Sequence, residues 1–245
     1  ISLGLMQGNE VIGSFRLTTK TPRTSDEFGL CIKELLDMTK LQDDDIEAVI
    51  ISSVVPKIMY SLTSAIVKFL HKDPIIVGPG IKTGISIRTD NPREVGADRI
   101  VDISMAYHTY HKSCIIVDFG TATTFDYISG EGVFKYTVIA PGLGIVANAL
   151  TSQTAKLPEI EIQKPESILN GNTITGMQAG VIYGYIGSVE YIIKQMKKEL
   201  KLKDCLVIAT GGLGKVIAKE TKEIDLFDPD VAYKGMRILY DLNKK

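Results

Sequence analysis

Three short segments of the chain combine glycine with hydroxyl or charged side chains in ways that suit phosphate chemistry. The most informative begins at Asp118 and continues Phe-Gly-Thr-Ala-Thr-Thr, between two apolar stretches predicted as strands. An acid at a strand end, a glycine that lets a ligand approach the backbone, and several hydroxyls suit a polyphosphate and its cation. The alternative is an ordinary Asp-Gly turn with solvated threonines, and this segment alone does not separate the two.

A second glycine-rich turn, ATGGLG at 209–214, follows a predicted buried strand and precedes a predicted helix. Gly211 and Gly212 would let a nucleotide approach the backbone and the start of that helix. Turns between strands and helices carry glycine for steric reasons in many α/β proteins, so this motif is weak by itself.

The third segment, NPREVGADR at 91–99, places an acid beside an arginine at the start of a predicted helix. Arg99 is suited to gripping a carboxylate with two hydrogen bonds, and Asp98 could accept a hydroxyl proton beside a reaction centre. Taken alone, the pair is better explained as an acidic residue at a helix start with a surface arginine.

Composition favours a protein that binds small ligands. Lys and Arg together number 28 and Asp and Glu 29, so the chain lacks the positive field that nucleic acid or an anionic membrane requires. No uninterrupted apolar stretch approaches the roughly 20 residues that span a bilayer. The three widely spaced cysteines are expected to be buried free thiols, which fits a reducing cytoplasm.

The order of predicted elements indicates an α/β fold built twice. A hairpin with its turn at 7–9 is followed by helices at 24–39 and after Pro56 and by strands at 48–55 and 74–78. A second series starts near Ser113 with a hairpin, and its later elements are helices at 143–153, 173–200, 213–221 and 230–242 and a strand at 206–212. We therefore expect two lobes, 1–105 and 106–245, with mixed sheets flanked by helices, a ligand cleft between them, and the last helix able to pack back on the first lobe.

Glycine recurs every four residues at 176, 180 and 184 along the predicted long helix. Such a smooth stripe permits close approach of another helix. We interpret it as a lobe-packing surface in preference to a dimer contact.

Five blocks occur in the order and at about the separations found in type III pantothenate kinases, and the chain resembles that family over nearly its whole length. The blocks are NPREVGADRI, VDFGTATTFD, APG with TAKLP, GNTITGMQAGVIYGYIG and ATGGL. The opening residues match the segment directly after the family's first phosphate loop, which has the form Asp-x-Gly-Asn-Thr-Asn. Since Ile1 stands where the residue after that loop would be, we expect residues to be missing here and ATP binding to be poor without them.

The resemblance implies two ribonuclease H-like lobes of the acetate kinase, sugar kinase, heat-shock 70 and actin superfamily. It implies ATP-dependent phosphorylation of pantothenate to 4′-phosphopantothenate, the first step of coenzyme A biosynthesis, by a cytoplasmic homodimer. The implied cofactors are Mg²⁺ and a monovalent cation, K⁺ or NH₄⁺. The alternative is a non-catalytic regulator of the Bvg accessory factor type on the same fold.

The resemblance also assigns roles to individual residues. Asp98 falls at the family's proton acceptor and Arg99 at the residue that holds the substrate carboxylate, within a pantothenate-binding block that includes Gly96 and Ala97. The other implied site residues are Asp118 for the monovalent cation, Gly120, Thr121, Gly211 and Gly212 for ATP, and Thr173 for the substrate. Many relatives have a tyrosine at the position of Thr89 that contacts pantothenate, so this contact is expected to be absent or supplied otherwise.

Overall fold

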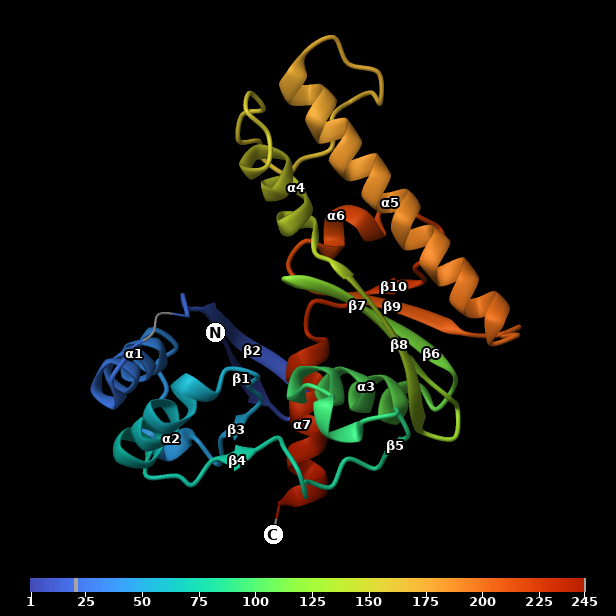
Figure 1. The fold of residues 1–245 in the computed structure, drawn as a ribbon. Coiled ribbons are helices and arrows are strands. Elements are labelled where there is room, and N and C mark those ends of the chain that lie inside the picture. Colours follow the sequence, from blue (N-terminus) through green and yellow to red (C-terminus); the bar gives the residue numbers. More distant parts are fainter. Residues whose placement is uncertain (20–21, 245) are drawn as a thin grey trace. The chain divides into compact units, whose positions relative to one another are not determined.

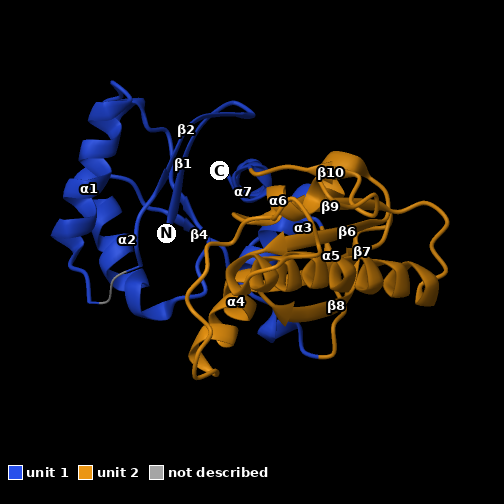
Figure 2. Cartoon of the chain, turned by 90° about the horizontal axis from the view of Figure 1, so that it is seen from above, with its two compact units in different colours: residues 1–84, 91–105, 230–245 blue, residues 85–90, 106–229 orange. Residues whose placement is uncertain are grey.

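The computed structural model describes residues 1–19 and 22–244, whose contacts form two compact units (Figure 2). Unit 1 comprises residues 1–84, 91–105 and 230–245, and unit 2 comprises residues 85–90 and 106–229. Helix α3 (Ala97–Tyr110) begins in unit 1 and ends in unit 2. The C-terminal residues thus belong to the same unit as the N-terminal ones.

Unit 1 opens with the predicted hairpin, which the structure confirms. Strands β1 (Ser2–Gln7) and β2 (Glu10–Arg16) pair antiparallel and form a sheet of their own. Gly8 in the connecting turn has φ +59°, a conformation that glycine adopts without steric cost.

Two helices of unit 1, α1 (Ser25–Met38) and α2 (Pro56–Leu70), pack against each other (Figure 1). The predicted cap of the first is confirmed, because the Glu27 N–H donates to the Thr24 hydroxyl over 3.2 Å and the Glu27 carboxylate accepts from the Thr24 N–H over 2.7 Å. Both helices contribute to one apolar core that contains Phe28, Leu36, Ile58, Leu62, Ala65, Ile66 and Leu70.

Strands β3 (Ile50–Ile51) and β4 (Ile75–Ile76) form a second, parallel ladder in unit 1, separate from the hairpin. The predicted strands at 48–55 and 74–78 are therefore too long. Within the described residues, β3 and β4 pair only with each other, and their hydrogen-bonded ladder is two residues long. Short 3₁₀ helices, Asp43–Asp45 and Pro92–Glu94, lie in the connections of this unit.

Helix α7 (Val231–Asn243) completes unit 1 and packs through glycines. A Cβ added at Gly235 would lie 2.3 Å from the Val101 carbonyl oxygen, and one at Gly4 would lie 2.4 Å from the Tyr233 ring. The absence of a side chain at these two positions lets α7 approach both α3 and β1 closely.

Unit 2 contains a six-stranded mixed sheet with the order β10-β9-β6-β7-β8-β5 (Figure 1). Strand β6 pairs parallel with β9 and antiparallel with β7, and β7 pairs antiparallel with β8. The edge strands β5 and β10, which sequence reasoning did not predict, are only two residues long. The strand bounds are β5 (Ser86–Ile87), β6 (Cys114–Phe119), β7 (Ala122–Ile128), β8 (Val133–Pro141), β9 (Leu206–Thr210) and β10 (Leu226–Phe227).

Helices α4 (Leu143–Ser152) and α5 (Thr173–Glu199) contribute to the apolar core of unit 2 together with the sheet. Buried α5 residues such as Ile182, Val189 and Ile193 join Ile115 and Phe125 of the strands in this core. Helix α6 (Gly214–Ala218) spans only five residues, so the prediction of a helix over 213–221 was too long. No helix in the described part of the chain has the length and apolar character needed to cross a membrane.

The glycine stripe of α5 faces open space. Beyond the backbone of α5 itself, added Cβ atoms at Gly176, Gly180 and Gly184 would meet no atom of the described chain within 4 Å. The prediction that this stripe packs within the chain, in preference to a dimer contact, is therefore wrong for the described residues. Together with Ile168, Ala179 and Tyr183 these glycines line a shallow depression on unit 2.

Replacing Gly235 with alanine should destabilise unit 1. Alanine normally stabilises a helix by about 1 kcal/mol relative to glycine, but here its methyl group meets the Val101 carbonyl, and such overpacking costs about 1–3 kcal/mol. Urea denaturation followed by circular dichroism should show the loss. The control Gly144→Ala, in α4 with open space around the added carbon, should be neutral or stabilising, and equal effects of the two changes would contradict this account of α7.

Candidate active site

The parallel pairing of β6 with β9 brings two of the predicted phosphate segments together within unit 2. Asp118 is the partner of Thr210 in this ladder, so the turns that follow both strands leave the sheet at the same edge. Gly211 has φ +92°, and a Cβ there would lie 2.6 Å from both an Asp118 carboxylate oxygen and the Phe119 carbonyl oxygen. The Gly211 backbone is therefore packed directly on the end of β6.

A third turn, at Gly142, joins these two. Its N–H donates to the Thr121 carbonyl over 3.0 Å, and an added Cβ would lie 2.2 Å from that oxygen and 2.5 Å from the Gly120 carbonyl oxygen. Gly120 and Thr121 remain exposed, so their backbone is accessible to a ligand. Sequence reasoning did not count Gly142 as a site residue, although it belongs to the APG block.

Polar groups beneath these turns connect them to α5. The buried hydroxyl of Thr123 is hydrogen-bonded to that of Tyr185, which donates to the Pro141 carbonyl over 3.2 Å. Burial raises the pKa of the Tyr185 phenol, so it stays neutral and able to donate. The sequence did not single out Tyr185, because a tyrosine on the apolar face of a helix is typical of a core residue. Its hydroxyl was the one feature that could have indicated a polar role.

The other predicted group, Gly96 to Arg99, lies in unit 1 at the start of α3. The Asp98 carboxylate accepts a hydrogen bond from the Arg99 N–H over 2.9 Å, as acids do at helix starts. A Cβ on Gly96 would lie 2.4 Å from the same carboxylate oxygen and 3.2 Å from the Val54 side chain. Gly96 thus leaves the space that Asp98 occupies.

Asp98 is exposed and also lines a cavity of about 740 Å³ within unit 1. Its neighbours in the block, Ala97 and Arg99, are half-buried. The carboxylate is therefore accessible both to solvent and to a ligand that enters this unit.

Thr173 and Thr89 belong to parts of unit 2 other than the turns after β6 and β9. Thr173 is the exposed first residue of α5, whose start is capped by the Asn172 side chain accepting from the Thr175 N–H over 3.0 Å. The Thr89 hydroxyl is buried with no hydrogen-bond partner among the described residues.

Clustered metal ligands and reactive thiols were also looked for among the side chains that the structure describes. Among residues 1–19 and 22–244, no three His, Cys, Asp or Glu side chains converge as a metal-holding group. Burial raises the pKa of Cys114 to about 12 and that of Cys205 to about 11, which keeps both thiols protonated near neutral pH. Cys114 is buried, as predicted, but Cys31 and Cys205 are only partly so.

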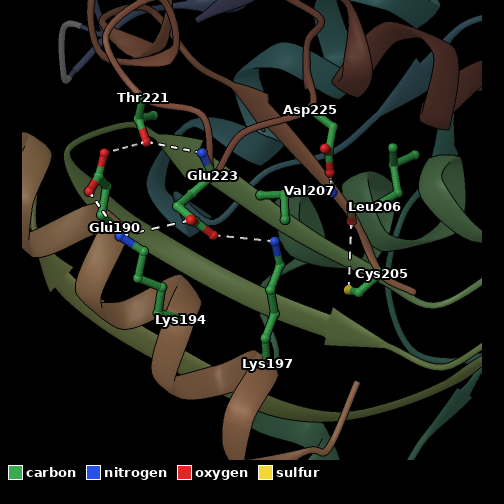
Figure 3. Close-up of polar contacts among 9 residues, drawn as sticks. All are labelled: Glu190, Lys194, Lys197, Cys205, Leu206, Val207, Thr221, Glu223 and Asp225. Atoms are coloured by element: carbon green, nitrogen blue, oxygen red, sulfur yellow. Dashed lines mark hydrogen bonds and ion pairs between the residues drawn. The ribbon is translucent and has the colours of Figure 1, made fainter. Parts of the chain in front are cut away.

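A polar network anchors the chain that follows the Gly211 turn (Figure 3). Thr221 donates to the Glu190 carboxylate over 2.8 Å, and Lys194 donates to the same carboxylate over 3.1 Å. The Thr221 hydrogen bond, followed by Lys194, lowers the pKa of Glu190. Asp225 accepts from the Val207 N–H over 2.8 Å and so ties the segment to β9. Exposed ion pairs contribute little each, and the network mainly defines the path of this segment.

Comparison with known proteins shows which protein family this α/β chain belongs to. The family described as type III pantothenate kinase matches residues 1–195. A type III pantothenate kinase of Agathobacter rectalis is 50% identical over 98% of this chain and 92% of its own length, and one of Bifidobacterium longum is 49% identical over 100% and 96%. The chain thus belongs to a family of kinases. That family is the type III pantothenate kinases, as the resemblance of the five blocks indicated.

One solved structure shares the fold at greater distance. The crystal structure of a conserved putative Baf family transcriptional activator from Campylobacter jejuni is 18% identical, covers 84% of this chain and 87% of its own, and superposes with a TM-score of 0.53. At this identity the likeness shows the fold alone.

Gly96→Ala should lower kinase activity without unfolding the protein. The added methyl group would lie 2.4 Å from an Asp98 carboxylate oxygen, so the Asp98 side chain has to rotate away. With the role predicted for Asp98, a displacement of about 1 Å should cost on the order of 10²-fold in rate. An assay with pantothenate and ATP, alongside circular dichroism, tests this. Gly78→Ala, with open space around the added carbon, serves as the control. Equal activity of the two variants would contradict the prediction that activity depends on the position of the Asp98 carboxylate.

Proposed function

We propose that this protein transfers the γ-phosphoryl group of ATP to the primary hydroxyl of pantothenate, forming 4′-phosphopantothenate and ADP, the first step of coenzyme A biosynthesis. The observation that carries the proposal is the 50% identity to a type III pantothenate kinase over 98% of the chain. The segments that could do this chemistry, Gly96–Arg99 and Asp118–Thr121, are present in the order that the family requires.

The turns of unit 2 suit the ATP phosphates. Gly120, Thr121 and Gly211 lie on neighbouring turns. Because Gly142 and Gly211 have no side chain, the backbones of the turns can pack directly against one another. Phosphoryl transfer depends mainly on alignment and on neutralising the charge of the phosphate oxygens. Mg²⁺ supplies part of that neutralisation when it binds with ATP. We infer that Gly212 and Thr121 also contact the nucleotide.

Asp98 and Arg99 have separate roles in this proposal. Asp98 orients the pantothenate hydroxyl and accepts its proton, for which its exposure and its place beside a cavity are suitable. Arg99 holds the pantothenate carboxylate through a charge-assisted pair. Gly96 and Ala97 shape the start of α3 around the substrate, and Thr173 provides a further polar contact.

Asp118 is the proposed ligand of a monovalent cation, K⁺ or NH₄⁺. An Asp118 oxygen and the Phe119 carbonyl oxygen both lie 2.6 Å from the position a Cβ would take on Gly211, so two hard oxygen donors stand close together. Such donors suit K⁺, whose selection depends on cavity size and ligand number.

The finer biological setting is also part of the proposal. We propose a cytoplasmic homodimer, and the open glycine stripe of α5 offers a surface where a second copy can approach closely. The balance of 28 basic and 29 acidic residues supports small-molecule partners over nucleic acid or membrane.

The division of labour between Asp98 and Arg99 can be tested with the protein expressed from its complete gene. Asp98→Asn should lower kcat by roughly 10²–10⁴-fold with little change in the KM for pantothenate, since it removes a proton acceptor used in the transition state. Arg99→Ala should instead weaken pantothenate binding by about 2–5 kcal/mol, because the substrate carboxylate loses its partner. Steady-state kinetics with both substrates measure these effects.

Asp73→Asn, a change of an exposed acid in another loop of unit 1, is the matched control and should behave as wild type. A folded Asp98→Asn enzyme with normal turnover would remove the proton-acceptor role. Absence of 4′-phosphopantothenate by mass spectrometry with the wild-type protein would overturn the proposed function itself.

Replacing K⁺ by Na⁺ should remove most activity, because the smaller ion does not satisfy a site sized for K⁺. Asp118→Asn should reduce activity in K⁺ to about the level that wild type shows in Na⁺. Initial rates in the two chloride salts at constant ionic strength provide the measurement. Equal rates of the wild-type enzyme in both salts would exclude the cation role of Asp118.

A further inference from the structure

The hydroxyl of Tyr185 lies between α5 and the ends of two strands of unit 2. Tyr185 is only 8% exposed, and its side chain lies among the buried apolar residues that α5 shares with the sheet. A tyrosine in such surroundings needs a hydrogen-bond partner for its hydroxyl. Here the hydroxyl has two partners, Thr123 on β7 and Pro141 on β8, so it joins the helix to both strands.

The direction of these two hydrogen bonds follows from their chemistry. The Pro141 carbonyl can only accept, so over 3.2 Å it takes the single hydrogen of the Tyr185 hydroxyl. The buried Thr123 hydroxyl then donates to the Tyr185 oxygen. Because proline has no N–H, Pro141 can join such a chain only through its carbonyl. The chain therefore runs in one direction, from Thr123 through Tyr185 to Pro141.

Both partners of Tyr185 adjoin the turns that are proposed to hold the ATP phosphates. Thr123 follows Thr121 by two residues. Pro141 is the ladder partner of Ala122 and directly precedes Gly142, whose N–H donates to the Thr121 carbonyl over 3.0 Å. A shift of Pro141 would therefore reach the Thr121 backbone through a single residue.

The ring of Tyr185 reaches the turn after β9 through Phe119. The centroids of these two rings lie 6.3 Å apart, and Phe119 is itself buried at the end of β6. A Cβ added at Gly214, where α6 begins, would lie 2.9 Å from the Phe119 ring. One side chain of α5 is thus connected, directly or through one residue, to the turns after β6, β8 and β9.

We propose that Tyr185 is a positioning residue for the nucleotide: its hydroxyl fixes the Pro141 carbonyl relative to α5 and so holds the backbones of Thr121 and Gly142 where they bind the ATP phosphates. This role depends on the proposed contact of Gly120 and Thr121 with ATP. Helix α5 suits it, because a 27-residue helix packed along the sheet is a more rigid reference than the turns themselves. Tyr185 acts through the turns and does not touch the nucleotide.

Tyr185→Phe tests the proposal, because it removes the hydroxyl and keeps the ring. In the protein expressed from its complete gene, the KM for ATP should rise by roughly 2- to 10-fold, the factor that one neutral hydrogen bond contributes to an equilibrium. The KM for pantothenate should not change. Partial unfolding alone would lower the apparent kcat and leave both KM values as they are, since KM does not depend on the amount of active enzyme. An unchanged KM for ATP would overturn the proposal.

Tyr127→Phe is the matched control. It removes a tyrosine hydroxyl that is hydrogen-bonded to the Ser113 hydroxyl over 3.4 Å, at the opposite end of the β6–β7 ladder from the turns. Both KM values should equal those of the wild type. If wild type forms 4′-phosphopantothenate and Tyr185→Phe has an unchanged KM for ATP, the positioning role fails while the proposed function stands.

A double variant separates positioning from stability. Tyr185→Phe leaves the buried Thr123 hydroxyl without its acceptor and should lower the thermal midpoint by about 2–4 °C. Adding Thr123→Val removes both hydroxyls at nearly constant shape, so most of the midpoint should return. The KM for ATP should stay raised, because Pro141 is still not held. Recovery of this KM together with the midpoint would show that the hydroxyl serves stability alone, and would overturn the proposal.

Amide hydrogen exchange without substrates gives a measurement that is independent of catalysis. The Gly142 N–H, which donates to the Thr121 carbonyl, should exchange about 3-fold faster or more in Tyr185→Phe than in wild type. The Gly132 N–H, which donates to the Ser129 carbonyl over 3.0 Å in the turn between β7 and β8, should exchange at the wild-type rate. Equal exchange at Gly142 in the two proteins would also overturn the proposal.

Discussion

The parallel pairing of β6 with β9 is the constraint on which the candidate site of unit 2 depends. It places Asp118 beside Thr210 and therefore makes two turns far apart in the sequence leave the sheet at one edge. The approach of these turns is close enough that a side chain at Gly142 or Gly211 would collide with backbone oxygen atoms. The glycines of this site thus act first by allowing the turns to pack, and the accessibility of the Gly120 and Thr121 backbone follows from that packing.

In unit 1, glycines likewise allow close packing, here between helices and a strand. Its strands are short, and a pair of two-residue strands contributes little stability by itself. The helices hold the unit together, with α7 placed against α3 at Gly235 and against β1 at Gly4. Asp98 takes its position from this framework, since Gly96 at the start of α3 leaves room for its carboxylate.

The two units differ in how completely their sheets are paired. In unit 2, β6 has a partner on each edge and its apolar residues are buried. Among the described residues of unit 1, β1 and β3 each have a partner on one edge only, and residues of both strands line a cavity that also includes Ser52, whose hydroxyl is buried without a hydrogen-bond partner. Unpaired backbone groups in apolar surroundings are costly, so the strands of unit 1 gain less stability from their own hydrogen bonds than the fully paired strands of unit 2.

The sequence by itself determined the element order, the capping of α1 by Thr24, the hairpin around Gly8 and the family, because these depend on local patterns and on motifs of contiguous residues. Candidate residues within one motif, such as Gly96 to Arg99, could be named for the same reason. Only the tertiary structure decided that β3 ends after two residues, that Gly142 supports the Thr121 turn, and that Tyr185 connects α5 to the end of β8. These features depend on which strand lies beside which and on how closely two backbones approach, and such long-range contacts leave no periodic signal in the sequence.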